Sequence, residues 1–173
     1  MFKELNILKI FFESPTKEFN VREAARILNI APATASSQLK SFAKNGFILE
    51  RKERNLILYK ANLENLEYIE AKKYYNMLKI RESGIIEELD RFYIKPTIIL
   101  FGSASEGLDI ENSDIDLVII SENTKLMNVE KFEKKLNREV QMFAVKNIKD
   151  LGNPHLINNI INGTVLQGEI KWT

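Results

Sequence analysis

The stretch that decides the fold of the C-terminal half is "LFGSASEGLDIENSDIDLVII", from Leu100 to Ile120. One apolar run ends at a Gly-Ser pair, and a second apolar run opens with Asp114 and Asp116. Residues i and i+2 of a strand share a face, so these two side chains project side by side. Burying carboxylates is costly unless they are paired or bind a metal. The stretch therefore predicts a strand whose first residues hold a cation.

The segment before the aspartates supplies the other half of such a site. Thr97–Phe101 is a short, β-rich apolar run, as expected for a buried strand. Gly102 allows a tight turn, and Ser103 is expected to cap a short helix that runs through Gly107. A glycine turn at a helix start directs free N–H groups at one point, where an anion can bind. Two close carboxylates resist ionising together, and Mg²⁺ resolves that conflict because it prefers one or two carboxylates plus substrate phosphate oxygens.

These residues carry a family resemblance. Gly102-Ser103, Gly107 and the string "SDIDL" resemble the signature of the DNA polymerase beta superfamily of nucleotidyltransferases, in its small minimal form. A helix "VEKFEKKLN", a strand "REVQMFAV" and a last helix "HLINNIINGTVLQGE" agree with that family. The resemblance covers about the last half of the chain and implies a small mixed α/β domain.

The resemblance also implies a reaction and a site. A nucleoside monophosphate would be transferred from a nucleoside triphosphate to an acceptor. Gly102 and Ser103 would bind the β- and γ-phosphates of that nucleotide. Asp114 and Asp116 would be the catalytic residues and the ligands of Mg²⁺, which would bridge the phosphates and place the α-phosphorus for in-line attack.

Two positions depart from the family pattern. Active members usually add a third carboxylate from the next strand, and the matching residue here is Gln141, whose amide cannot take a proton. Glu139 shares that strand face but lies two residues away, about 7 Å along the strand. Between Ser103 and Gly107 many relatives carry Arg or Lys, whereas this chain has Ala104, Ser105 and Glu106.

The first third of the chain predicts helices followed by a β-hairpin. Asn20 and Glu23 have the spacing of a capping box at the start of one helix. Pro32 suits the first turn of the next helix, which is expected to end at Asn45. The string "FILERKERNLILYKAN" then indicates two alternating strands around the charged tip Arg51–Asn55.

This order of elements resembles the winged helix-turn-helix of bacterial and archaeal repressors, above all in the string "VREAARILNIAPATASSQLKSFAKNGFI". The resemblance implies that the helix from Pro32 to Asn45 enters the major groove of double-stranded DNA, while the hairpin tip lies along the backbone. Short polar groups approach base edges closely, and basic groups neutralise phosphate. The alternative is a module for dimerisation or protein docking. The candidate DNA-binding residues are Thr34, Ser36, Ser37, Lys40, Arg51, Lys52 and Arg54.

Composition bounds the other function classes. The 173 residues include no Cys, which excludes a disulfide framework and a thiolate zinc site. No apolar run approaches the ~20 residues of a membrane span, and the N-terminus is unlike a signal peptide, so we expect a soluble, cytoplasmic protein with no membrane partner. The formal net charge is +1, but residues 1–62 carry +5 and the remainder −4. This asymmetry suggests different partners for the two parts.

We therefore expect an α+β protein built from a winged helix-turn-helix domain at residues 1–62, a helical connector at 63–82 and a nucleotidyltransferase-like domain at 83–173. The connector has apolar residues at roughly helical intervals, and by default it packs on its own domains. The alternative is a helix that forms a homodimer, which would suit paired DNA half-sites.

Three functions remain open. The first is a Mg²⁺-dependent nucleotidyltransferase that is brought to, or regulated at, a DNA site. The second is a transcriptional regulator whose degenerate nucleotidyltransferase domain senses a nucleotide or mediates contacts. The third is a toxin–antitoxin-type partner that acts on another protein. The aspartate pair favours the first function, and Gln141 and Glu106 favour the second.

Overall fold

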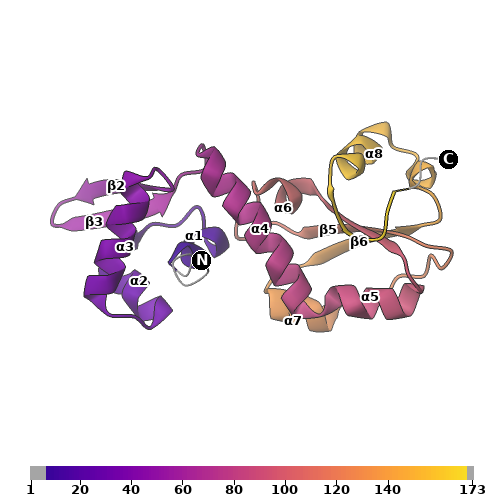
Figure 1. Ribbon diagram of the computed structural model, residues 1–173, viewed down its shortest axis with the longest axis horizontal. Helices are drawn as coiled ribbons and strands as arrows, with labels where there is room; N and C mark the ends of the chain where they lie inside the picture. Colours follow the sequence, from indigo (N-terminus) through magenta and orange to yellow (C-terminus); the bar gives the residue numbers. More distant parts are fainter. Residues whose placement is uncertain (1–6, 171–173) are drawn as a thin grey trace. The chain divides into compact units, whose positions relative to one another are not determined.

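The computed structural model describes residues 7–170 of the chain. The fold is mixed α+β, with helices and two separate sheets. The chain divides into two compact units, Met1–Lys72 and Lys73–Thr173, and each unit contains one of the sheets (Figure 1). The division falls inside helix α4 (Leu66–Ser83), which contributes residues to both units.

The first unit combines short helices with a three-stranded sheet. Its strands follow the order β1-β3-β2, and both pairings are antiparallel. The hairpin was predicted, but the two-residue β1 was not, because so short a strand has no readable periodicity. The elements before α4 are α1 (Leu8–Glu13), β1 (Phe19–Asn20), α2 (Val21–Leu28), α3 (Pro32–Lys44), β2 (Ile48–Glu53) and β3 (Leu56–Ala61).

Local signals set the ends of these elements. Asn20 is the N-cap of α2, and its side chain accepts hydrogen bonds from Arg22 N and Glu23 N, both at 3.0 Å. The Glu23 carboxylate accepts a bond from Asn20 N at 2.9 Å, which completes the predicted capping box. The hairpin turn is narrower than the predicted tip, because β2 runs to Glu53 and only Arg54 and Asn55 remain outside the strands.

We predict that Asn20→Ala lowers the free energy of unfolding of the first unit by about 1 kcal/mol, because two backbone N–H groups lose their acceptor. Asn20→Asp is the matched control, since a carboxylate keeps the acceptor and favours a helix N-terminus. Chemical denaturation followed by circular dichroism measures both variants. Equal losses in the two variants would contradict the assignment of this cap.

The second unit is a four-stranded mixed sheet with helices on both faces. Its strand order is β6-β5-β4-β7; β5 and β6 are parallel, and the other two pairings are antiparallel. After α4 the chain forms α5 (Ile85–Tyr93), β4 (Thr97–Phe101), α6 (Gly102–Glu106), β5 (Ile115–Ile120), α7 (Glu130–Leu136), β6 (Val140–Val145), the 3₁₀-helix η1 (Ile148–Leu151), α8 (Pro154–Ile161) and β7 (Thr164–Gln167).

Alternation along β4 and β5 divides the core between the two sheet faces. Ile98 and Leu117 face one cluster, which also holds buried residues of α5 and α7. Ile99 and Val118 face the other cluster, to which α8 contributes Ile160. Figure 1 accordingly shows α5 and α7 on one side of this sheet and α8 on the other. Both faces are covered, which explains why the central strands are nearly continuous apolar runs.

The end of the chain corrects one expectation. The predicted last helix stops at Ile161, and Thr164–Gln167 becomes edge strand β7, which pairs with β4. The reason lies at Gly163, where an added Cβ would lie 2.5 Å from the carbonyl oxygen of Leu100. Only a residue without a side chain lets the chain pass so close to β4.

Candidate functional site

The turn after β4 lies directly against the second of the two predicted aspartates. Phe101 is the register partner of Asp116 across the antiparallel β4–β5 pair. The next residue, Gly102, has a φ of +69°, which favours glycine. A Cβ built on Gly102 would overlap with Oδ2 of Asp116. The Gly102 backbone and the Asp116 carboxylate are therefore close together, and any larger residue at position 102 would adopt a strained backbone and displace that carboxylate.

The two aspartates occupy different local environments. Strand β5 begins at Ile115, so Asp114 lies one residue before the strand, not within it as predicted. Asp114 is exposed and Asp116 is partly buried. Within residues 7–170 neither carboxylate forms an ion pair with a basic side chain. The pair therefore keeps its negative charge available for an external cation.

Electrostatics act on Asp116 in particular. Burial raises the pKa of the Asp116 carboxyl above its usual value of 3.8, and the negative charge of Asp114 raises it further. The guanidinium of Arg138 opposes both effects and lowers the pKa of Asp116. A bound cation would favour the ionised form of Asp116 and so offset the free-energy cost that burial and repulsion by Asp114 impose on that form.

Strand β6 brings two more predicted residues to the site. Gln141 is the register partner of Asp116, and Ile115 N donates to the Glu139 carbonyl at 2.9 Å. Paired residues of neighbouring strands share a face, so Gln141 flanks Asp116. In the part of the chain that the structure describes, no three His, Cys, Asp or Glu side chains converge as a metal site. Glu139 therefore does not complete a carboxylate triad with the aspartates.

The donor set fits a hard divalent cation that is completed by substrate. Mg²⁺ typically takes one or two carboxylates, with water and phosphate oxygens filling its remaining positions. Asp114 and Asp116 supply the carboxylates. A shallow pocket of about 320 Å³ is lined in part by Asp114, Arg138 and Glu139, but not by Asp116.

The glycine turn differs from expectation in its cap. Helix α6 begins at Gly102, Phe101 is its N-cap, and no side chain caps it, so the predicted Ser103 cap is wrong. The Ser103 hydroxyl has no hydrogen-bond partner within residues 7–170. Ser105 Oγ instead donates to the Gly102 carbonyl at 2.8 Å. Glu106 is exposed.

Sequence reasoning missed Arg138, which the structure places between the aspartate loop and β6. Its Nε donates to the Ser113 carbonyl at 2.6 Å, and its Nη2 donates to the Asp114 carbonyl at 2.8 Å. Its Nη1 pairs with the buried Asp109 at 2.9 Å. The signal in the sequence was an Arg just before an apolar strand, together with an Asp two residues after Gly107.

In the first unit, the predicted DNA-binding residues differ in solvent exposure. Thr34, Ser37 and Lys40 of α3 are exposed, while Ser36 is partly buried. Lys52 and Arg54 at the hairpin end are also exposed.

Arg51 is already occupied by carboxylates of its own unit. It forms two hydrogen bonds to the Glu18 carboxylate, at 3.0 and 2.7 Å, and an ion pair with Glu53 at 2.7 Å. These carboxylates raise the pKa of Arg51 above its usual range, and Arg51 in turn lowers the pKa of Glu18. The positive charge of Arg51 is thus balanced locally.

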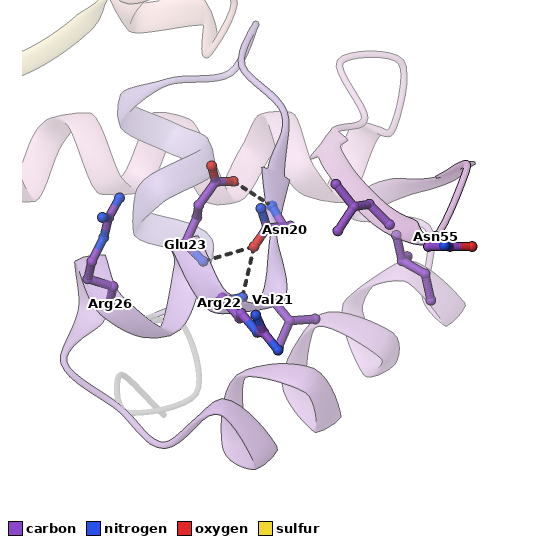
Figure 2. A pocket seen from close by; sticks show the side chains of 8 residues that line it. Asn20, Val21, Arg22, Glu23, Arg26 and Asn55 are labelled. Carbon is purple, nitrogen blue, oxygen red and sulfur yellow. Dashed lines mark hydrogen bonds between the residues drawn. The ribbon is translucent and has the colours of Figure 1, made fainter.

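A hollow of about 670 Å³ lies between the start of α2 and the hairpin turn. Figure 2 shows Arg22 and Arg26 projecting from α2, with Asn55 on the hairpin. Both arginines are exposed and were not predicted as site residues. Their i, i+4 spacing, which places them on one helix face, was the available signal.

We predict that Asp116→Asn raises the melting temperature of the metal-free second unit by a few degrees near neutral pH. The pKa of Asp116 is raised on folding, so its ionised form destabilises the folded state above that pKa. The gain should shrink as the pH falls and vanish below the usual value of 3.8, where the carboxyl is protonated in both states. Differential scanning fluorimetry in EDTA measures the effect, with the exposed Asp114→Asn as a control that gains less. A lower melting temperature for Asp116→Asn would contradict this electrostatic account.

Comparison with known proteins bears on the second unit. Residues 82–166 match the family model for the nucleotidyltransferase domain, a range that runs from the end of α4 to β7 and includes both aspartates. No curated protein matches the chain. Of the helices in residues 7–170, none combines the length and apolar character needed to cross a membrane. The domain match and the mixed sheet support a nucleotidyltransferase-like function in general.

Proposed function

We propose that the second unit is a Mg²⁺-dependent nucleotidyltransferase that transfers a nucleoside monophosphate from a nucleoside triphosphate to an acceptor. The observation that carries this proposal is Asp116 against the Gly102 backbone, with the charge of Asp114 close enough to raise its pKa and no ion pair from a basic side chain to either carboxylate within residues 7–170. The match of residues 82–166 to the nucleotidyltransferase domain supports the same reading.

The site residues have separate roles in this proposal. Asp114 and Asp116 would hold Mg²⁺, which when bound supplies charge neutralisation for the triphosphate. Gly102 lets phosphate oxygens approach the backbone, and the free Ser103 hydroxyl donates to one of them. The partial burial of Asp116 strengthens its attraction for a cation relative to a fully solvated carboxylate. Rate acceleration then comes from positioning and charge stabilisation.

This mechanism also requires that the acceptor hydroxyl lose its proton. Gln141 lies next to Asp116 and cannot accept a proton. General-base assistance contributes about 10²–10⁴-fold to rate in enzymes that have it. We therefore expect slow transfer, with the proton passing to solvent.

Gln141 also favours a second candidate function. A site that keeps the cation and phosphate ligands but lacks the base would bind nucleotide with little turnover. In that case the protein is a transcriptional regulator whose second unit senses a nucleotide. The two functions share the site and differ only in whether chemistry follows binding.

We predict that the wild-type protein transfers label from nucleoside triphosphates, incubated with Mg²⁺ and cell extract, and that Asp114→Asn with Asp116→Asn abolishes transfer. Gln141→Asp should raise the rate at least about tenfold, because it adds a proton acceptor beside the pair. Gln141→Asn is the matched control and should not raise it.

The outcomes separate the two functions. Mg²⁺-dependent nucleotide binding without transfer, even with Gln141→Asp, would favour the regulator. Absence of Mg²⁺-dependent nucleotide binding in the wild type would overturn both.

We further propose that the first unit is a winged helix-turn-helix domain that binds double-stranded DNA. The support is the surface of α3, with exposed Thr34, Ser37 and Lys40, together with the basic hairpin end. The net charge of +5 over residues 1–62 points to a polyanion as partner. Arg22 and Arg26 add two exposed cations beside the hairpin turn.

We predict that Lys40→Gln and Arg54→Gln each weaken duplex binding and reduce the salt slope by about one, as the loss of one phosphate contact requires. Arg51→Gln should have a smaller effect, because Glu18 and Glu53 already neutralise that guanidinium. Lys146→Gln, in the second unit, is the matched control for loss of one positive charge. Fluorescence anisotropy at several salt concentrations makes the measurement. Slopes that stay unchanged for Lys40 and Arg54 would remove the proposed DNA surface.

A further inference from the structure

The loop that carries Asp114 has no regular structure of its own. It runs from the end of α6 to the start of β5 at Ile115, so the strand ladder does not hold Asp114. A tight turn, in which Ser113 N donates to the Ile110 carbonyl at 3.1 Å, orders its middle. Something else must fix the backbone at Asp114 if its carboxylate is to stay beside Asp116.

Arg138 makes that connection. Three of its guanidinium nitrogens are used, on the carbonyls of Ser113 and Asp114 and on the carboxylate of Asp109. The Arg138 side chain is only 13% exposed, and that of Asp109 only 3%. A planar guanidinium with several donors in fixed directions suits such a multiple contact, whereas an ammonium is a single point charge.

Asp109 is itself held from its other oxygen. Asn76 of α4 donates from Nδ2 to Asp109 Oδ1 at 2.8 Å, and the same nitrogen contacts the Ala104 carbonyl at 2.9 Å. Ala104 follows Gly102-Ser103 directly in α6. A chain of polar contacts, buried at Asn76 and Asp109 and more exposed toward Asp114, therefore links the glycine turn to Arg138 and the backbone of Asp114. These contacts join the two halves of the site.

We propose that Arg138 is a positioning residue that orders the Asp114 loop so that the two carboxylates bind one cation. The inference rests on the proposed cation site and adds to it the group that preorganises it. Its partner Asp109 balances the charge of Arg138, so the guanidinium orders the loop with little added repulsion of the cation.

A positioning role and a purely electrostatic role of Arg138 predict opposite effects of its removal on cation affinity. If Arg138 were only a nearby positive charge, its removal would strengthen cation binding, and Arg138→Lys would leave binding unchanged. If Arg138 positions the loop, both Arg138→Gln and Arg138→Lys weaken cation binding, because neither makes the three directed hydrogen bonds. Residues that orient metal ligands typically change metal affinity about 10–100-fold when they are mutated.

The experiment measures Mn²⁺ binding to the full chain by isothermal titration calorimetry and by the electron paramagnetic resonance signal of free Mn²⁺. We expect a Kd about tenfold higher for Arg138→Gln and Arg138→Lys than for the wild type. Lys134→Gln, which removes an exposed charge of α7, is the matched control and should bind as the wild type does. Circular dichroism melts establish that each variant is folded at the temperature of the titration.

Each outcome either supports or overturns the positioning role of Arg138. Equal or tighter binding by folded Arg138→Gln, with Arg138→Lys unchanged, overturns the positioning role and leaves the cation site intact. A wild-type protein that binds no Mn²⁺ overturns the proposed function and this inference with it. If Arg138→Gln does not fold, Arg138→Lys, which keeps the charge and most of the aliphatic stem, decides between the two signs.

Discussion

The second unit places two like charges close together, Asp114 one residue before strand β5 and Asp116 within it. The apolar β5 cannot bury Asp116 fully without cost, and Asp114 beside it adds repulsion. The fold accommodates this arrangement because Gly102, which has no side chain, leaves space for the Asp116 carboxylate. Under the proposed function, an external cation would offset this cost.

The same constraint explains several features around the pair. An Arg placed directly against both carboxylates would satisfy them and remove the reason to bind a cation. Arg138 instead donates hydrogen bonds to two backbone carbonyls and to Asp109. The site therefore gains rigidity from an arginine while its two aspartates remain unpaired within the described chain.

Much of this architecture could be predicted from local sequence. The capping box at Asn20, the strand Thr97–Phe101 and the turn at Gly102 each follow from residue types at fixed short spacings, and the structure has all three. Asp114 and Asp116 were likewise predicted to be neighbours from their i, i+2 spacing, although Asp114 lies one residue before β5. Local chemistry specified these features without tertiary information.

The features that were missed depend on partners far apart in the sequence. The bond between Arg51 and Glu18 was not predicted, because Glu18 lies 33 residues away in the sequence. Arg138 pairs with Asp109 across 29 residues. Residues Thr164–Gln167 were included in a last helix because the segment resembles the last helix of the family, but their pairing with β4 makes them a strand. Tertiary contacts overrode local signals in each case.

Gln141 affects two requirements of a transferase site differently, namely ligand binding and proton removal. Cation and nucleotide binding require negative charge and a close backbone, which Asp114, Asp116 and Gly102 would supply in the proposed site. Transfer to a hydroxyl also requires that a proton leave, and the amide beside Asp116 provides no acceptor. A third carboxylate would help that step, but it would add repulsion to a pair in which the pKa of Asp116 is already raised. Replacing it with an amide relieves the repulsion and keeps a neutral oxygen ligand. On the proposed function, such a site would bind a nucleotide without a side chain that assists proton transfer, and a protein that detects a nucleotide needs only the binding groups.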